Sequence, residues 1–198
     1  MKYPSELNAL IAHLKKLPGV GSKTAERFAF QLINWPQTGL SCFANLIATI
    51  KEKIHYCPEC GCLTEELNCF FCKNPQRDQN FVCIVATAKD VFPLEDTRIF
   101  KGLYHVLGGL LSPVQGCSPE NLHIDKLEKR VHERAISEVI IALDSTLEGD
   151  ATALYLKEQL QAWGIKTSRL AFGLPMGSTL EFVDSGTLSR ALLGRQFL

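Results

Sequence analysis

The hydrophobic residues of the first fifty positions recur every three or four residues, which is the spacing of one helix face. One such stretch covers 5–17, a second begins behind Ser22, and a third covers 40–53. Ser22 suits an N-cap, because its hydroxyl can accept a hydrogen bond from a free amide of the first turn. Pro18 and the two glycines flanking Val20 would end the first helix in a tight turn. The pattern predicts three helices, with the first two joined as a hairpin.

Beyond residue 80 the pattern changes to short apolar runs rich in β-branched residues, which suit the buried strands of a mostly parallel sheet. Three such runs lie at 81–86, 139–143 and 167–172. Helical stretches alternate with them at 119–138 and 150–163, and Gly164 would stop the second of these. The intervening stretches 75–79 and 102–117 are expected to be linker and loop. Alternating strands and helices predict an α/β layer.

The composition is that of a globular protein, since 46% of the 198 residues are hydrophobic and 21% are charged. Basic and acidic residues number 21 each, which excludes a uniformly basic nucleic-acid coat. Residues 1–53 nevertheless hold seven basic side chains against three acidic ones, a net charge of +4. A basic head before a mildly acidic body is compatible with a polyanionic partner and equally with solvated helix faces.

No apolar run reaches the roughly 18–20 residues that a membrane-spanning helix needs. The first residues also lack the apolar core and small-residue cleavage site of a secretory signal. We therefore expect a cytoplasmic protein without a membrane partner.

The turn between the first two helices carries candidate chemistry. Gly19 and Gly21 permit a tight bend and leave amide groups uncovered at the start of the second helix, where the helix dipole favours an anion. Lys23 lies in that first turn, where a cation costs roughly 0.3–1 kcal/mol, and Arg27 follows one turn later. A docked phosphate would relieve this repulsion, so the pattern predicts contact with a nucleic-acid backbone. An ordinary helical hairpin with solvated charges is the alternative.

Five of the eight cysteines fall within 57–72, and four of them have the spacing of a metal site. Cys57 and Cys60 form one Cys-x2-Cys pair, and after eight intervening residues Cys69 and Cys72 form another. Four thiolates predict a closed, tetrahedral, structural Zn²⁺ site, one per chain. Two disulfides are the alternative, which a reducing cytoplasm disfavours. Cys62, two positions past Cys60, could compete as a ligand but breaks the spacing.

A second candidate site follows the strand at 139–143. Asp144, Glu148 and Asp150 lie where this strand ends and a helix begins, the edge at which open α/β sheets bind ligands. Their carboxylates could hold Mg²⁺, as metal-dependent phosphoryl transfer requires. Capping of the helix N-terminus is the simpler interpretation, because acidic residues are favoured in a first turn.

Five segments resemble, in order, the RecR family of bacterial recombination mediators, and the resemblance extends over essentially the whole chain. They are 17–27 (LPGVGSKTAER), 104–109 (YHVLGG), 111–113 (LSP), 148–156 (EGDATALYL) and 174–184 (LPMGSTLEFVD). The four-cysteine pattern lies between the first two. This order and spacing are more specific than any single motif.

The resemblance implies an α/β protein of four parts. These are a helix–hairpin–helix DNA-binding domain at 1–54, a four-cysteine zinc finger at 55–77, a Toprim domain with a mostly parallel sheet at 78–175, and a C-terminal oligomerisation arm at 176–198. It also implies a ring-shaped homotetramer associated with the nucleoid. Such proteins bind single- and double-stranded DNA, are not known as catalysts, and act with RecO and in some pathways RecF to load recombinase onto single-stranded DNA.

One departure from the catalytic Toprim pattern concerns the active-site acids. Catalytic members carry a Glu at the end of the first strand, where this chain has Ala86, and an Asp-x-Asp, where it has Asp144-Ser145-Thr146. Loss of a general acid or base argues against catalysis. The resemblance implies an acid at position 86, so its absence is expected to weaken metal or partner binding as well.

Three functions of different classes therefore compete. The first is a non-enzymatic DNA clamp that mediates recombination and repair. The second is a metal-dependent, nuclease-like or primase-like Toprim enzyme that uses the acidic residues. The third is a zinc-containing adaptor that binds proteins but not DNA.

Overall fold

The computed structural model describes residues 3–65 and 69–195. Two compact units make up the chain, Met1–Lys53 and Ile54–Leu198. Within the described residues, none of the helices combines the length and the apolar character needed to cross a membrane.

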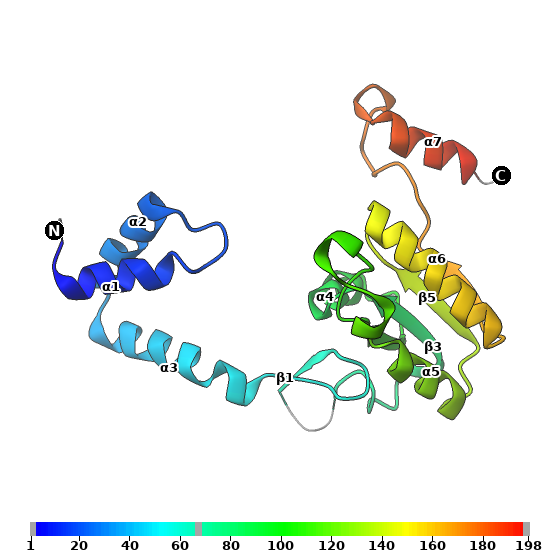
Figure 1. The fold of residues 1–198 in the computed structure, drawn as a ribbon, viewed down its shortest axis with the longest axis horizontal. Coiled ribbons are helices and arrows are strands. Elements are labelled where there is room, and N and C mark those ends of the chain that lie inside the picture. Colours follow the sequence, from blue (N-terminus) through cyan, green and yellow to red (C-terminus); the bar gives the residue numbers. More distant parts are fainter. Residues whose placement is uncertain (1–2, 66–68, 196–198) are drawn as a thin grey trace. The chain divides into compact units, whose positions relative to one another are not determined.

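The first unit contains three helices, as the sequence predicts: α1 (Ser5–Leu14), α2 (Ser22–Ile33) and α3 (Gln37–Lys53). Helices α1 and α2 pack against each other through a small core (Figure 1). Ala25 and Ala29 of α2 are fully buried there, beside the largely buried Ile11 of α1. Alanine at both positions lets the two backbones approach closely.

Two details at the hairpin differ from the sequence prediction. Helix α1 ends at Leu14 rather than at residue 17, because the amides of Lys16 and Leu17 bond three residues back, to His13 and Leu14. This tighter pattern is common where a helix terminates. The N-cap of α2 is Gly21, not Ser22, and no side chain caps the helix.

Helix α3 has an apolar stripe that its own unit leaves uncovered. No residue of α3 is buried. Phe43, Leu46, Ile47 and Ile50 follow helical spacing, and each has between 42% and 58% of its surface exposed. Exposed apolar side chains that form one continuous stripe are typical of a protein–protein contact.

The second unit is built on a four-stranded sheet in the order β4-β3-β5-β6, with every pairing parallel. Its strands are β3 (Asp78–Val85), β4 (Gly102–Val106), β5 (Glu138–Ala142) and β6 (Lys166–Arg169). Its helices are α4 (Val91–Asp96), α5 (Ile124–Glu133), α6 (Leu147–Ala162) and α7 (Ser185–Leu193). The α/β class with a parallel sheet is thereby confirmed.

Alternate residues of β3 serve two different cores. Val82 and Ile84 belong to the larger core, to which α5 and α6 contribute side chains such as Leu127 and Leu156. Cys83 belongs to the core on the other face, with α4 and the cysteine-rich segment. The period of two along a strand produces this division. Figure 1 shows α6 lying along the sheet.

Three sequence predictions in this unit need correction. The stretch 102–117 contains β4, a wholly buried strand, where the sequence predicted a loop. The long helix expected at 119–138 is a short 3₁₀ turn, Pro119–Asn121, followed by α5. Asp78 and Gln79, assigned to a linker, begin β3.

Strand β4 was missed because Gly102 is a residue type depleted in strands and the polar His105 interrupts the apolar run. Both residues are nevertheless buried. His105 bonds through Nε2 to the carbonyl of His123 at 2.9 Å, and burial lowers the pKa of its imidazole to about 3. A neutral histidine can therefore occupy the core.

Candidate functional site

The four cysteines predicted as ligands converge at one point. The sulfur atoms of Cys57, Cys60, Cys69 and Cys72 all lie within 4.8 Å of one another, and all four residues are buried. Cys57 and Cys60 lie in the loop that connects β1 (His55–Tyr56) to β2 (Leu63–Thr64). Cys69 and Cys72 lie in the loop ahead of β3. Among the described residues this is the one group of His, Cys, Asp or Glu side chains with the arrangement of a metal site.

The distances suit a tetrahedral ion and not a disulfide. Cys60 Sγ and Cys69 Sγ are 3.6 Å apart, and all eight cysteines are free thiols. Sulfurs around a tetrahedral ion with Zn–S bonds near 2.3 Å would be roughly 3.8 Å apart. A disulfide would need about 2.05 Å.

Backbone hydrogen bonds shape the first pair into a knuckle around the sulfurs. The Cys57 amide donates to the Cys62 carbonyl at 2.8 Å, and the Gly61 amide donates to the Cys57 carbonyl at 2.9 Å. Gly61 has a φ of +74°, and a Cβ there would lie only 2.9 Å from Cβ of Val106. Glycine is thus required both for the turn and for the close approach of the knuckle to β4.

The thiols are close enough to compete for protons. Hydrogen bonds from Cys60, Cys69 and Cys72 hold the pKa of the Cys57 thiol far below its usual range. The bonds to Cys57 and Cys62 raise the pKa of Cys60 instead. A cation that accepts all four sulfurs as thiolates removes this competition.

The knuckle closes the outer edge of the sheet. β4 is the end strand, and its Val106 amide points outward and donates to the Cys60 carbonyl at 2.8 Å. The Tyr104 carbonyl at the same edge accepts a hydrogen bond from Arg130 of α5. Backbone groups that would otherwise remain unpaired at the edge are therefore satisfied.

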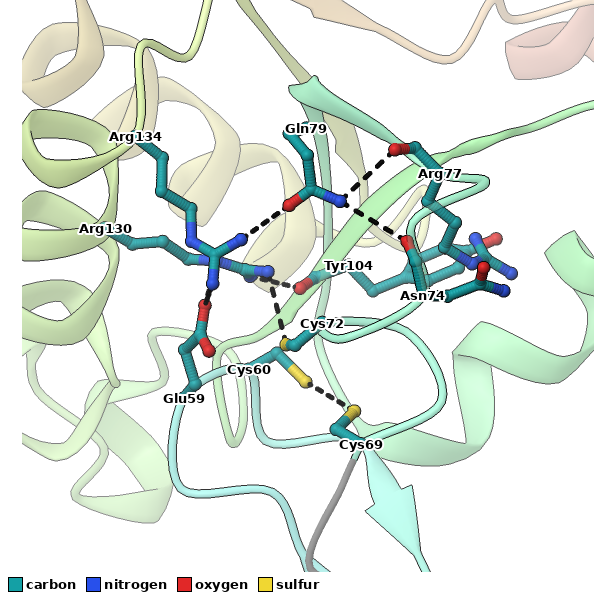
Figure 2. Close-up of polar contacts among 10 residues, drawn as sticks. All are labelled: Glu59, Cys60, Cys69, Cys72, Asn74, Arg77, Gln79, Tyr104, Arg130 and Arg134. Atoms are coloured by element: carbon teal, nitrogen blue, oxygen red, sulfur yellow. Dashed lines mark hydrogen bonds and ion pairs between the residues drawn. The ribbon is translucent and has the colours of Figure 1, made fainter.

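A network of arginines connects the cysteine cluster to the sheet (Figure 2). Arg130 Nη2 donates to Cys72 Sγ at 3.4 Å. Glu59, in the knuckle, forms ion pairs with Arg130 at 3.3 Å and with Arg134 at 2.6 Å. Arg134 also donates to Gln79 Oε1 at 2.6 Å. These partners could not be predicted from local sequence patterns, because they come from α5, from the residue that ends it and from β3.

Arg77 is a second buried cation beside the cluster. Its guanidinium lies 4.8 Å from the centre of the Phe71 ring and pairs with Glu95 of α4. Tyr104 donates its hydroxyl to Glu95 at 2.7 Å. Partial burial raises the pKa of Glu95, but the hydrogen bonds from Arg77 and Tyr104 outweigh it and lower the pKa.

The helical hairpin presents its two glycines without obstruction. Gly19 has a φ of +77°, and added Cβ atoms at Gly19 or Gly21 would meet no atom within 4 Å. Lys23 and Arg27 are exposed, and neither forms an ion pair with any described residue. Helix α2 has no acidic residue in its first turn. An open, positively charged surface therefore surrounds the turn.

The three acidic residues of the second candidate site do not meet. Asp144 and Glu148 line one pocket at the end of the strands, together with Ala86, Lys89 and residues from neighbouring loops. Asp90 also lines it, but its carboxylate accepts hydrogen bonds from Thr87. The sequence interpretation did not include Lys89 and Asp90, which lie in a short 3₁₀ turn soon after the end of β3.

Asp150 points to the C-terminal arm instead. Its two carboxylate oxygens pair with Arg169 at 2.7 Å and with Arg190 of α7 at 2.6 Å. Both guanidiniums also contact the Phe172 ring, at 4.6 and 4.5 Å from its centre. Hydrogen bonds from Arg169 and Arg190 lower the pKa of Asp150. Its carboxylate therefore acts here as a clamp for the arm.

Gly149 explains why the loop takes this form. A Cβ at Gly149 would lie 2.0 Å from the Asp144 carbonyl oxygen, so only glycine permits the strand to pass into α6 in this way. Thr146 caps the helix by accepting a hydrogen bond from the Gly149 amide at 3.1 Å.

The protein combines an open hairpin, a buried four-cysteine cluster and a parallel sheet with an attached arm. This combination is that of a multidomain protein of the Toprim class, and comparison with known families agrees. A model described as "RecR, helix-hairpin-helix" matches 7–51, one described as "Toprim domain" matches 80–171, and one described as "RecR, C-terminal" matches 173–196.

Curated relatives are similar over the whole chain. The protein is 56% identical to "Recombination protein RecR" of Protochlamydia amoebophila (strain UWE25) over 195 residues, 98% of each chain. Identity is 48% over 196 residues with the protein of that name from Chlamydia pneumoniae, again 98% of each chain. It is 45% over 198 residues with that of Moorella thermoacetica (strain ATCC 39073 / JCM 9320), covering both chains fully. The chain belongs to the RecR family, which confirms the resemblance drawn from the order of its motifs.

We predict that the clamp around Asp150 controls the order of α7. The variant Asp150→Asn removes the charge that holds Arg190, so amide hydrogen exchange in α7 should become several-fold faster at pH 7. Because the pKa of Asp150 is lowered, the clamp contributes fully above the ordinary Asp pKa of about 3.9 and is lost as the pH falls through the lower pKa of the folded protein. Glu158→Gln, an exposed change on the same helix, should leave the exchange of α7 unaltered.

We also predict one metal ion per chain in the purified protein. Elemental analysis should detect it in the wild type and in Cys42→Ser, whose thiol is exposed on α3. Cys57→Ser and Cys72→Ser should lose the metal, together with solubility, because the cluster supplies much of the order of its segment. A metal-free preparation that is folded and monodisperse would contradict this.

Proposed function

We propose that this protein is a non-enzymatic, DNA-binding mediator of recombination and repair. The observation that carries the proposal is the open hairpin turn of a RecR-type helix–hairpin–helix unit, with two unpaired cations on α2. The curated relatives, named recombination proteins, support the same process.

The turn would bind a phosphate of either strand without reading bases. Gly19 and Gly21 allow the backbone to approach closely, and the uncapped amides at the start of α2 would donate to phosphate oxygens. Lys23 and Arg27 would supply the charge, with Lys15 and Lys16 extending it at the end of α1. Contacts of this kind position a protein on single- or double-stranded DNA but do not select a sequence.

The cysteine cluster would hold a structural Zn²⁺. Four buried sulfurs leave no open coordination position for a water or a substrate, which distinguishes a structural site from a catalytic one. The residues fit the ion in number, ligand type and spacing. When bound, zinc would supply folding free energy to a segment whose two strands are only two residues each.

The three acids predicted from the sequence do not converge, which supports a non-enzymatic role. Asp144 and Glu148 share a pocket with Ala86, where a catalytic Toprim domain has its glutamate, and Asp150 is engaged with two arginines. Metal-dependent phosphoryl transfer usually needs carboxylates from neighbouring strands around the same ion. If Mg²⁺ binds here at all, Asp144 and Glu148 are its candidate ligands.

Self-association is supported by the uncovered stripe on α3. Phe43, Leu46, Ile47 and Ile50 would be covered by another copy of the chain, and the arm at 176–198 would extend the assembly. The resemblance to RecR proteins favours a ring-shaped tetramer that encircles DNA near the nucleoid. It also favours RecO and possibly RecF as partners in loading recombinase onto single-stranded or gapped DNA.

Each segment of the chain would have its own role. Residues 1–54 would bind DNA, 55–77 would hold the metal, 78–175 would form the Toprim domain that meets partner proteins, and 176–198 would act in assembly. An alternative function, a metal-dependent nuclease-like or primase-like enzyme, is kept open by the pocket that Asp144 and Glu148 share.

Lys23→Ala should weaken DNA binding to a similar extent for every sequence. Loss of one phosphate contact should lower the slope of log K against log salt by about one unit. Fluorescence anisotropy with several unrelated oligonucleotides over a salt series measures both quantities. Lys157→Ala removes the same charge from an exposed site on α6 and should leave affinity and slope unchanged. Wild-type affinity and slope in Lys23→Ala would refute the hairpin assignment.

Incubation with labelled DNA and Mg²⁺ or Mn²⁺ tests the enzymatic alternative. We expect the DNA to remain intact, because the acids needed for phosphoryl transfer do not converge. Cleavage that is abolished in Glu148→Ala would establish the nuclease instead and overturn the non-enzymatic proposal.

A further inference from the structure

Arg130 is a cation buried between the cysteine cluster and the sheet. Only 3% of its surface is exposed, and it reaches from α5 across the outer edge of β4. Nη1 donates to the Tyr104 carbonyl and Nη2 to Cys72 Sγ at 3.4 Å, as Figure 2 shows. Nε lies 3.3 Å from Glu59 Oε1, too poorly aligned for a hydrogen bond. The guanidinium is thus fixed with one of its edges on a metal-ligand sulfur.

Carboxylates alone do not neutralise this cation. Among the described residues Glu59 is the only carboxylate in ion-pair contact with Arg130, and Arg134 shares the same oxygen at a shorter distance. One negative charge therefore faces two positive charges. A buried charge without full compensation is costly, so a further negative partner is needed.

The metal-bound cluster supplies that partner. A divalent ion with four thiolates carries a net charge of about −2, spread over the sulfurs. A thiolate is also a far better acceptor than a thiol, so in the metal-bound state the Arg130 bond to Cys72 carries opposite charges on donor and acceptor. The two buried charges therefore stabilise each other across a distance of 3.4 Å.

We propose that Arg130 is a positioning residue of the metal centre, which retains the ion by neutralising the tetrathiolate and by holding Cys72 in place. The proposal rests on the metal site proposed above. Because the same guanidinium binds the Tyr104 carbonyl, it also makes the docking of the knuckle onto β4 depend on metal occupancy. Outer partners of metal ligands commonly change affinity in this way.

The experiment compares metal retention in the full-length protein. Wild type, Arg130→Met and Arg130→Lys are loaded with Zn²⁺, and release to an excess of a chromophoric chelator is timed. We expect release to be about 10–100-fold faster in Arg130→Met, the range that outer-shell substitutions produce. Arg130→Lys should lie between the two, because it retains the charge but cannot bind Cys72 and Tyr104 simultaneously.

Arg134→Met is the matched control. It removes the other cation from Glu59 but touches no sulfur, so its release rate should stay close to that of the wild type. Equal acceleration in Arg134→Met and Arg130→Met would mean that loosening of the ion pairs is responsible, and the proposal would then fail.

Replacing Zn²⁺ by Co²⁺ gives an absorption spectrum that a purely structural role of Arg130 would not change. A hydrogen bond from a cation lowers the energy of the thiolate electrons, so the sulfur-to-cobalt charge-transfer band should shift to longer wavelength in Arg130→Met. Arg134→Met should keep the wild-type band. If Arg130→Met does not fold, Arg130→Lys carries the test by the same two measurements.

The outcomes separate the two proposals. Wild-type protein that binds no metal would refute the metal site itself. Wild-type protein that binds metal, together with Arg130 variants that match its release rate and its cobalt band, would refute the role of Arg130 alone.

Discussion

The closure of the four-cysteine cluster against the outer edge of β4 is the contact on which the second unit depends. In the segment between α3 and β3, the described residues include two strands of two residues each, too little regular structure to order the segment by itself. Four buried sulfurs and the Val106–Cys60 hydrogen bond order it instead. In return the knuckle covers the edge of a parallel sheet that would otherwise present unpaired backbone groups to solvent.

Electrostatics around this contact link elements that are distant in sequence. Arg77 joins the aromatic residues of the cysteine-rich segment to α4, and Arg130 joins Cys72 to α5 and β4. Both cations are buried, so each needs its partners in place. The cysteine segment and the sheet consequently form a single unit, which supports a scaffold rather than a detachable finger.

The hairpin turn and the strand ends of the sheet carry different chemistry. The hairpin turn is open and positively charged, whereas the strand ends that serve phosphoryl transfer in catalytic Toprim domains hold an alanine, and one of the expected acids clamps α7. The acid that the sequence placed third in this cluster, Asp150, is held by arginines instead. This contrast is consistent with the proposal of a protein that binds nucleic acid without cleaving it.

Local patterns in the sequence determined the hairpin, the cysteine ligand set, the strand–helix alternation and the family, because each depends on spacings of a few residues. Only the tertiary structure decided that the buried residues of β4 form a strand, since its partner β3 lies far along the chain and supplies the hydrogen bonds. It alone decided that Asp150 pairs with Arg190, 40 residues away, and that Arg130 meets Cys72, 58 residues away. Residues so far apart in the chain meet only when the elements that carry them pack together, and no local spacing records that choice.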